Sequence, residues 1–233
     1  MDKEEKISSG SAVLDKLLDG GYEKDILTTI YGPAGSGKTT CCLIAASCIS
    51  DSKKVIYIDT EGGFSVTRLS QLRKEDYKKV LEKMLFLKPT NFDEQKTIFE
   101  KLPRIVNSRI GLIVVDTISS LYRAGFNKDE IHEINRELGK QLSSLTEISR
   151  INSIPVLVAS QVYSSFDERE KVNMVGGDIL KYRSKCLIEF QSFHGSKRKA
   201  ILRKHRHLPE REVLFEIKDA GLEEINEKGF KLF

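Results

Sequence analysis

Gly32-Pro33-Ala34-Gly35-Ser36-Gly37-Lys38-Thr39 is a glycine-rich stretch of the form G-x-x-x-x-G-K-T, and it decides the fold class. The apolar, β-branched run Ile26–Tyr31 before it predicts a strand, and Thr40–Ile49 after it has the composition of a helix. Glycines let the backbone curl until consecutive N–H groups point at one anion, and the N-terminus of the following helix adds its positive dipole end. The stretch is therefore interpreted as a phosphate-binding P-loop.

The end of the loop carries the side chains that a nucleoside triphosphate and its metal ion need. Lys38 can neutralise the β- and γ-phosphates, and the Thr39 hydroxyl can ligate Mg²⁺. The predicted nucleotide contacts are Gly32, Pro33, Ala34, Gly35, Ser36, Gly37, Lys38, Thr39 and Thr40.

The composition fits one soluble α/β domain spanning residues 1–233. The chain has 233 residues, of which 39% are hydrophobic and 31% charged, so it is long enough to bury a full core. No apolar run approaches the length of a membrane span, and the N-terminus MDKEEKISSG lacks the apolar stretch of a signal peptide. We therefore expect a cytoplasmic protein without a membrane partner.

Basic residues are clustered, although the net charge is only +4. Between Lys197 and Arg211 seven lysines and arginines stand against one acid, Glu210, and a second cluster is Lys181-Tyr182-Arg183-Ser184-Lys185. Such patches are typical of surfaces that bind a polyanion. A solvated surface of strands and loops explains a single cluster equally well.

Cysteines and histidines show no metal-ligand spacing. Three of the four cysteines fall on the helix predicted after the P-loop, so a structural role is expected for Cys41, Cys42, Cys48 and Cys186. The pair His205-x-His207 lacks further ligand types nearby in the sequence. The predicted metal ligands are Thr39, in the P-loop, and Asp116, at the end of the predicted strand Leu112–Asp116.

Apolar runs and helical stretches alternate along the chain. Buried parallel strands are predicted at Val55–Asp59, Met84–Leu87, Leu112–Asp116 and Pro155–Ser160. Helices are predicted at Phe92–Leu102 and Asp129–Arg150, the second with a core-facing apolar stripe. Short antiparallel strands are expected at Cys186–Phe193, Ala200–Lys204 and Val213–Ile217. The predicted fold is a mostly parallel sheet flanked by helices, with an antiparallel C-terminal extension.

Polar residues at the ends of three predicted strands indicate which chemistry accompanies the P-loop. Asp116 ends a hydrophobic strand as in a Walker B motif and can hold magnesium through water. Glu61 lies just beyond another strand and can polarise the water that attacks the γ-phosphate, although a helix cap or a loop charge would explain it too. Gln161 ends a third strand, where its amide can contact the γ-phosphate.

The chain from Ile7 to about Phe230 resembles the core ATPase domain of RecA/RadA-type recombinases, and within them the archaeal RadB-type paralogues. The motifs that carry the resemblance are ISSGSAVLDKLLDGG, YIDTEGGFSVTRL, VVDTISSLYR, ASQV, MVGGDILKYRSK and RHLPEREVLFEI. They stand in register over the full length, which makes a chance resemblance very improbable.

The resemblance implies ATP and Mg²⁺ as cofactors and assigns roles to single residues. Lys38 and Asp116 become catalytic residues, Glu61 the water-activating base and Gln161 the γ-phosphate sensor, while Arg68 is implied to stack on the adenine. Arg123 falls in the first DNA loop, and residues 163–177 correspond to the second. The implied DNA contacts are Arg123, Gly176, Gly177, Lys181, Arg183, Lys185, Lys197, Arg198 and Lys199.

Two departures from the family pattern bear on assembly. The chain starts directly at the core, without the N-terminal helical DNA-binding domain and the F-x-x-A docking peptide of full recombinases. Where recombinases carry a D-S-P segment over the neighbour's ATP, this chain has Lys204-His205-Arg206. This K-x-R pattern resembles the paired fingers of hexameric helicases, which stabilise charge on a neighbour's γ-phosphate. Alternatively, Lys204 and Arg206 only belong to the basic surface that faces DNA.

The leading functional hypothesis is an ATP-binding, DNA-binding accessory protein of homologous recombination and repair, with slow ATPase activity. The alternatives are an active strand-exchange recombinase or ring-forming motor, and a nucleotide-switch adaptor; a small-molecule kinase fits poorly because no arginine-bearing lid follows the P-loop. The implied partners are DNA at the nucleoid, with single strands preferred and little sequence dependence, a RadA-type recombinase, a Holliday-junction nuclease and further copies of the chain.

Overall fold

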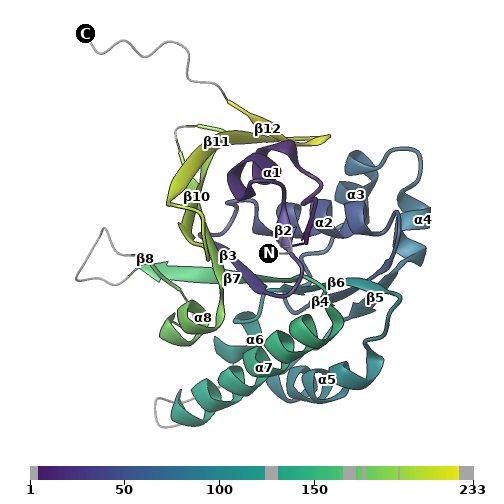
Figure 1. Ribbon diagram of the computed structural model, residues 1–233, viewed down its shortest axis with the longest axis vertical. Coiled ribbons are helices and arrows are strands. Elements are labelled where there is room, and N and C mark those ends of the chain that lie inside the picture. The colour runs from purple at the N-terminus through teal and green to yellow at the C-terminus, as the bar shows by residue number, and fades with distance from the viewer. Residues whose placement is uncertain (1–4, 124–130, 165–171, 175–176, 194, 226–233) are drawn as a thin grey trace.

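A ten-stranded mixed sheet forms the centre of the molecule in the computed structural model, which describes residues 5–123, 131–164, 172–174, 177–193 and 195–225. Its strands are β3 (Leu27–Gly32), β4 (Lys54–Asp59), β5 (Met84–Leu87), β6 (Ile110–Asp116), β7 (Val156–Ser164), β8 (Val172–Met174), β9 (Cys186–Ser192), β10 (Lys197–Lys204), β11 (Arg211–Lys218) and β12 (Gly221–Glu224). Their order is β12-β11-β10-β9-β3-β7-β6-β4-β5, and β8 pairs with β7 outside this path (Figure 1).

The strands from β5 to β9 in this order run parallel, which confirms the predicted parallel core. They are almost continuously apolar because helices cover both faces of the sheet. The register pairs Gly32 with Gln161 and Asp59 with Asp116. The polar residues at the carboxyl ends of these strands therefore meet along one edge of the sheet.

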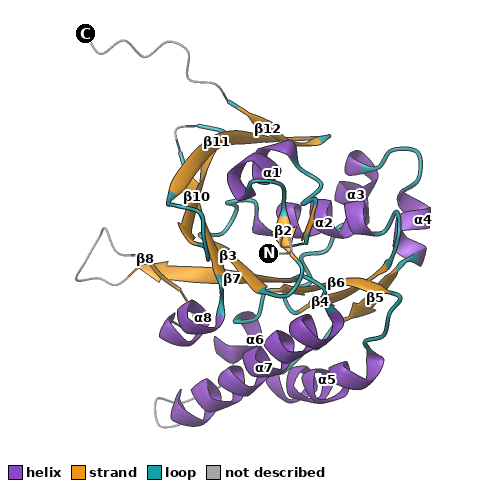
Figure 2. Cartoon of the chain, in the orientation of Figure 1, coloured by secondary structure: helices purple, strands orange, loops and turns teal. Residues whose placement is uncertain are grey.

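Helices lie on both faces of the sheet and bury two separate hydrophobic cores (Figures 1 and 2). The first core contains residues of α1 (Ala12–Leu18), α2 (Lys38–Ile49), α3 (Val66–Leu72) and α4 (Tyr77–Glu82). The second contains residues of α5 (Phe92–Ile105), α7 (Ile131–Asn152) and α8 (Gly177–Arg183), and α6 is the short helix Ser120–Arg123. Leu138, Leu142 and Leu145 are fully buried, which confirms the apolar stripe predicted for α7.

The predicted C-terminal extension is present, but β10 begins at Lys197 instead of Ala200, and β12 is an additional strand. β10, β11 and β12 are antiparallel, but β9 pairs in parallel with β3 on its other side and so belongs to both parts of the sheet. β7 continues to Ser164 instead of ending at Ser160, because β8 pairs with it beyond the last residue of β3. The prediction also missed α1 and the small sheet of β1 (Lys6–Ile7) and β2 (Tyr22–Glu23).

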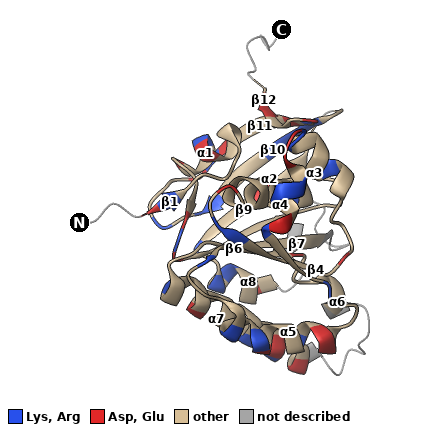
Figure 3. Cartoon of the chain, turned by 90° about the vertical axis from the view of Figure 1, so that its right-hand side faces the viewer, with Lys and Arg blue, Asp and Glu red and all other residues tan. Residues whose placement is uncertain are grey.

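Charged residues of both signs alternate on the outer helices. Figure 3 shows lysines and arginines interspersed with acidic residues along α5 and α7. This mixture is typical of solvated helix faces and does not mark a polyanion-binding surface. Within the described residues, every helix is too short or too polar to cross a bilayer.

Candidate nucleotide site

The P-loop lies between the carboxyl end of β3 and the first turn of α2, as the sequence predicts. Gly35 and Gly37 have φ angles of +73° and +107°, in the region that favours glycine. A Cβ atom on Gly32 would lie 2.3 Å from the carbonyl oxygen of Phe190 on β9, so a larger residue would force the strands apart. Steric constraints therefore explain why glycine is needed at both ends of the loop.

Lys38 folds its ammonium group over the P-loop itself. Its Nζ donates to the carbonyl oxygens of Gly32 at 2.8 Å and of Pro33 at 2.9 Å, and the residue is buried. Burial lowers the pKa of Lys38, while the nearby carboxylates of Glu61 and Asp116 act in the opposite direction. A triphosphate would supply the negative charge that this buried cation needs.

Asp116, at the end of β6, is almost completely buried beside Thr39. Burial raises the pKa of its carboxyl group to about 6, although hydrogen bonds from Thr39 and Tyr57 act to lower it. Tyr57 Oη donates to Asp116 Oδ2 at 2.9 Å and fixes the carboxylate. A hydroxyl and a carboxylate in contact form a set of hard oxygen donors, which fits Mg²⁺ held directly or through water.

Hydrogen bonds connect Glu61 to Thr117, just after β6, and to Gln161 within β7. Glu61 Oε1 accepts from Thr117 Oγ1 at 2.7 Å and from Gln161 Nε2 at 2.7 Å. Glu61 follows β4, Thr117 follows β6 and Gln161 lies on β7. The structure therefore brings the two predicted residues together and adds Thr117, which the sequence analysis missed although it directly follows the Walker B aspartate.

These residues surround a pocket of about 250 Å³ at the carboxyl edge of the sheet. The pocket also includes Ile217 of β11, so the C-terminal extension contributes to the candidate nucleotide site. Its lining consists of Ala34, Gly35, Gly37, Lys38, Thr39, Thr40, Glu61, Thr117, Gln161 and Ile217.

Arg68, predicted to stack on the adenine, binds the turn between β11 and β12. Its Nη2 donates to the carbonyl oxygen of Lys218 at 2.7 Å, and its Nη1 donates to that of Asp219 at 3.2 Å. Burial lowers the pKa of the guanidinium. These bonds use the edge of the guanidinium plane, whereas stacking uses its face, so the adenine role stays a prediction.

Arg198 contacts the P-loop, although the sequence grouped it with Lys197 and Lys199 as a DNA contact. Its Nε and Nη2 both donate to the carbonyl oxygen of Gly35 at 3.2 Å. Side chains alternate along a strand, so Lys197 and Lys199 point to the opposite face of β10 from Arg198. Lys199 forms an ion pair with Glu212 there at 2.9 Å.

Lys204 and Arg206 lie at the far end of β3 from the P-loop of the same chain. Lys204 pairs with Leu187, which pairs with Thr29 near the start of β3. Lys204 Nζ donates to the carbonyl oxygen of Lys181 at 2.7 Å, and Arg206 Nη2 donates to Asp25 Oδ1 at 2.9 Å. A finger role for the pair, which stays a prediction, therefore requires the nucleotide of another subunit.

The predicted DNA contacts fall in different parts of the fold or outside the described residues. Lys181 and Arg183 are on α8, and Gly177 begins that helix with a φ of +43°. Lys185 follows α8, where its N–H donates to Leu27. Gly176, most of both predicted DNA loops and the side chain of Arg123 lie outside the described part of the chain.

Asp116→Asn is expected to stabilise the metal-free protein. Because the folded state raises the pKa of Asp116 from 3.8 to about 6, ionisation of this carboxyl opposes folding at neutral pH. The variant should gain about 1–3 kcal/mol of unfolding free energy at pH 8. The gain should shrink as the pH falls from about 6 to the ordinary value of 3.8. Urea unfolding with a metal chelator, at several pH values, measures this; an equal gain at all pH values would contradict it.

A curled glycine-rich loop followed by Lys38 and Thr39, with Asp116 at the end of β6, defines a P-loop nucleotide-binding protein. Comparison with known proteins narrows this class. Residues 3–225 match the Rad51 family, and the chain belongs to that family.

Individual relatives carry the name DNA repair and recombination protein RadB. The protein of Methanocaldococcus jannaschii is 40% identical over 92% of this chain and 100% of its own length. That of Thermococcus gammatolerans is 40% identical over 95% of this chain and 100% of its own length. A crystal structure of the RadB recombinase superposes with a TM-score of 0.80 at 35% identity, covering 94% of this chain and 99% of the other. The predicted RecA-like fold and RadB-type relationship are thus confirmed.

Proposed function

We propose that the chain is an ATP-binding and DNA-binding accessory protein of homologous recombination and DNA repair, which hydrolyses ATP slowly with Mg²⁺. The names of its relatives support a role in recombination and repair. The pocket lined by Lys38 and Thr39, with the Asp116 carboxylate hydrogen-bonded to Thr39, supports ATP and Mg²⁺ as cofactors. The observation that carries the proposal is the hydrogen bond from Gln161 to Glu61.

This bond connects the proposed base to the strand that leads toward the proposed second DNA loop. Gln161 is the last residue of β7 that pairs with β3, and Val162 is the first that pairs with β8. A γ-phosphate that attracts the Gln161 amide would release Glu61 and shift the start of the β7–β8 hairpin. Both hydrogen bonds use Oε1 of Glu61, so we assign Oε2 as the oxygen that takes the proton from the attacking water.

The experiment that tests the proposal is ATP hydrolysis by the full chain with and without single-stranded DNA. Slow turnover that depends on Mg²⁺, together with DNA binding, is the expected result. Strong stimulation by DNA would favour the strand-exchange or motor alternative. No detectable ATP binding would overturn the proposal.

If ATP turnover is slow and unaffected by DNA, we infer that the bound nucleotide controls the binding of partner proteins. A RadA-type recombinase and a junction nuclease are the proposed partners in that case. Further copies of the chain are the partner that Lys204 and Arg206 would need, because their own P-loop lies at the other end of β3.

Replacing Lys197 and Lys199 together by alanine is expected to weaken DNA binding and its salt dependence. Removing one lysine–phosphate interaction should reduce the slope of log K against log salt by about 0.7 for single strands, so the double variant should reduce it by about 1.4. Arg198 stays unchanged in this variant because it contacts the P-loop. Fluorescence anisotropy at several salt concentrations measures the slope. An unchanged slope would mean that this part of β10 is only a solvated surface.

A further inference from the structure

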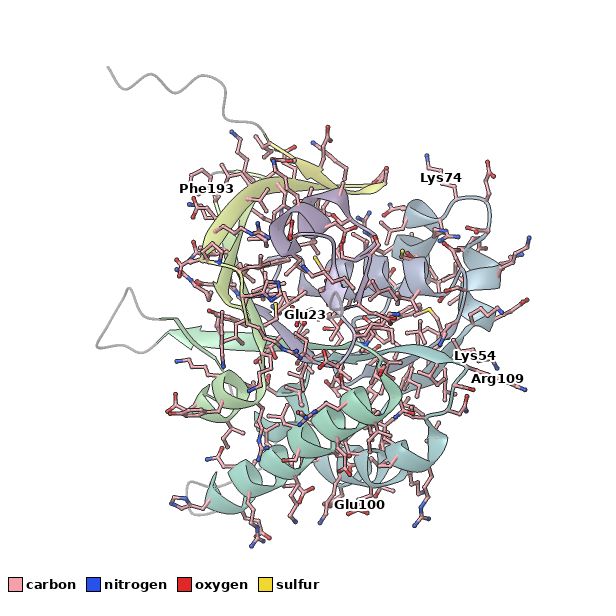
Figure 4. All side chains as sticks on the ribbon, viewed as in Figure 1. Glu23, Lys54, Lys74, Glu100, Arg109 and Phe193 are labelled. Atoms are coloured by element: carbon pink, nitrogen blue, oxygen red, sulfur yellow. The ribbon has the colours of Figure 1, made fainter. Side chains whose placement is uncertain are left out.

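Three metal-ligand side chains from distant parts of the sequence meet at the amino edge of the sheet. They are Glu23 on β2 and His205 and His207, which follow β10. One ligand atom of each lies within 4.8 Å of the others. Figure 4 labels Glu23 near the middle of the molecule, whereas Lys74 and Arg109 lie at its periphery. The sequence around His205-x-His207 offers no third ligand type, but the fold brings Glu23 beside the pair from another strand.

The burial of the three residues differs in a way that suits a metal site. The side chains of Glu23 and His205 are each only 1% exposed, whereas that of His207 is 42% exposed. The chain bends at residues 206 and 207 after β10, and both imidazoles lie beside one oxygen of Glu23 while Arg206 lies beside the other. The cluster is closed toward the protein and open toward solvent at His207.

The distances fit metal coordination better than direct hydrogen bonds. His205 Nε2 lies 3.4 Å and His207 Nδ1 lies 3.6 Å from the same oxygen, Glu23 Oε1. Good hydrogen bonds between nitrogen and oxygen are shorter, at about 2.7–3.2 Å. In a tetrahedral site with bonds of about 2.0–2.1 Å, neighbouring ligand atoms are separated by about 3.3 Å. One ion can therefore contact all three atoms after only small side-chain movements.

Neighbouring charges orient the carboxylate for such an ion. Arg206 Nε lies 3.4 Å from the other oxygen, Glu23 Oε2, and Arg206 Nη2 is bound to Asp25 Oδ1 at 2.9 Å. Outer contacts of this kind commonly hold a ligating carboxylate in one orientation. The backbone N–H of His207 donates weakly to Nδ1 of His205 at 3.5 Å. If Nε2 of His205 bound a metal ion, Nδ1 of the same ring would carry the proton, and this weak contact would be lost.

We propose that Glu23, His205 and His207 form a binding site for a borderline divalent transition metal, with Zn²⁺ the best match. Two imidazoles and one carboxylate are a known ligand set for zinc, and Mg²⁺ prefers oxygen ligands alone. The fourth position would be taken by water on the exposed side of His207. Bound metal would fix residues 204–207, and with them Lys204 and Arg206, against β2.

The test is a Zn²⁺ titration of the full chain against a chromophoric chelator, with saturating Mg²⁺ to occupy the Thr39–Asp116 site. One Zn²⁺ should bind per chain, and His207→Ala should lower the affinity by about tenfold or more. His132→Ala is the matched control because His132 is an exposed histidine on α7, and it should bind as the wild type does. Failure of the wild type to bind Zn²⁺, or wild-type affinity in His207→Ala, would overturn the proposal.

Co²⁺ provides a second measurement that separates this site from the cysteines. Cys48 is partly exposed and could bind a soft metal elsewhere. The wild-type Co²⁺ spectrum should lack a thiolate charge-transfer band, whereas His207→Cys should show one, because its sulfur lies near the place of Nδ1. A thiolate band already in the wild type, or none in His207→Cys, would mean that the metal binds away from residue 207.

Discussion

Lys38→Ala is expected to reduce ATP affinity by about 100-fold or more and to abolish measurable hydrolysis. The ammonium group of Lys38 is buried and donates to the carbonyl oxygens of Gly32 and Pro33. A bound triphosphate would exchange these two neutral acceptors for charged phosphate oxygens. Hydrogen bonds to charged groups contribute about 1.5–3 kcal/mol each, and two of them correspond to at least the stated decrease in affinity.

Isothermal titration with a slowly hydrolysed ATP analogue measures this decrease directly. Lys74→Ala is the matched control, because Lys74 is an exposed lysine at the periphery of the molecule (Figure 4). Its affinity should equal that of the wild type. Unchanged binding by Lys38→Ala would mean that the pocket at the P-loop is not the nucleotide site.

The P-loop could be predicted from sequence because its signal is local. Its glycines, Lys38 and Thr39 are adjacent in the chain, and the apolar runs on both sides determine where β3 ends and α2 begins. Asp116 could be predicted for a similar reason. A buried parallel strand is a continuous hydrophobic run, and a charged residue at its end is easily recognised in the sequence. Both features can be predicted without knowing which strands are neighbours in the sheet.

Contacts that depend on strand order could not be predicted in the same way. Glu61 and Gln161 are brought together only because β6 lies between β4 and β7 in the sheet. Arg198 reaches Gly35 because β10 pairs with β9, and β9 in turn pairs with β3. A basic run in the sequence predicts a charged surface but does not show which side chains the pleat directs inward.

The cluster of Glu23, His205 and His207 shows the same limit for metal ligands. A search for ligands at short spacing finds only His205-x-His207, because the third ligand comes from β2. Burial of a glutamate beside a histidine is also invisible in the sequence. Such a site can be found only after the small N-terminal sheet and the segment after β10 are placed together.

Glu61→Gln is expected to lower the rate of ATP hydrolysis by about 10²–10⁴-fold while ATP affinity stays close to that of the wild type. The substitution keeps the shape of the side chain and replaces one carboxylate oxygen by an NH₂ group, which cannot accept a proton from water. The remaining carbonyl oxygen can still accept from Thr117 Oγ1 and Gln161 Nε2, so both hydrogen bonds of Glu61 are retained. The variant therefore separates chemistry from structure at this position.

Single-turnover hydrolysis, measured beside ATP binding, checks both halves of this expectation. Glu100→Gln is the matched control, since Glu100 is an exposed glutamate on α5 at the periphery of the molecule (Figure 4). Its replacement removes the same charge from a residue that does not line the pocket. A rate equal to the wild type in Glu61→Gln would exclude Glu61 as the base and leave it a hydrogen-bonding role toward Gln161. Loss of ATP binding together with the rate would instead mean that the carboxylate supports the P-loop, because its charge acts on buried Lys38. Only a selective loss of rate fits a base that Thr117 holds toward the attacking water.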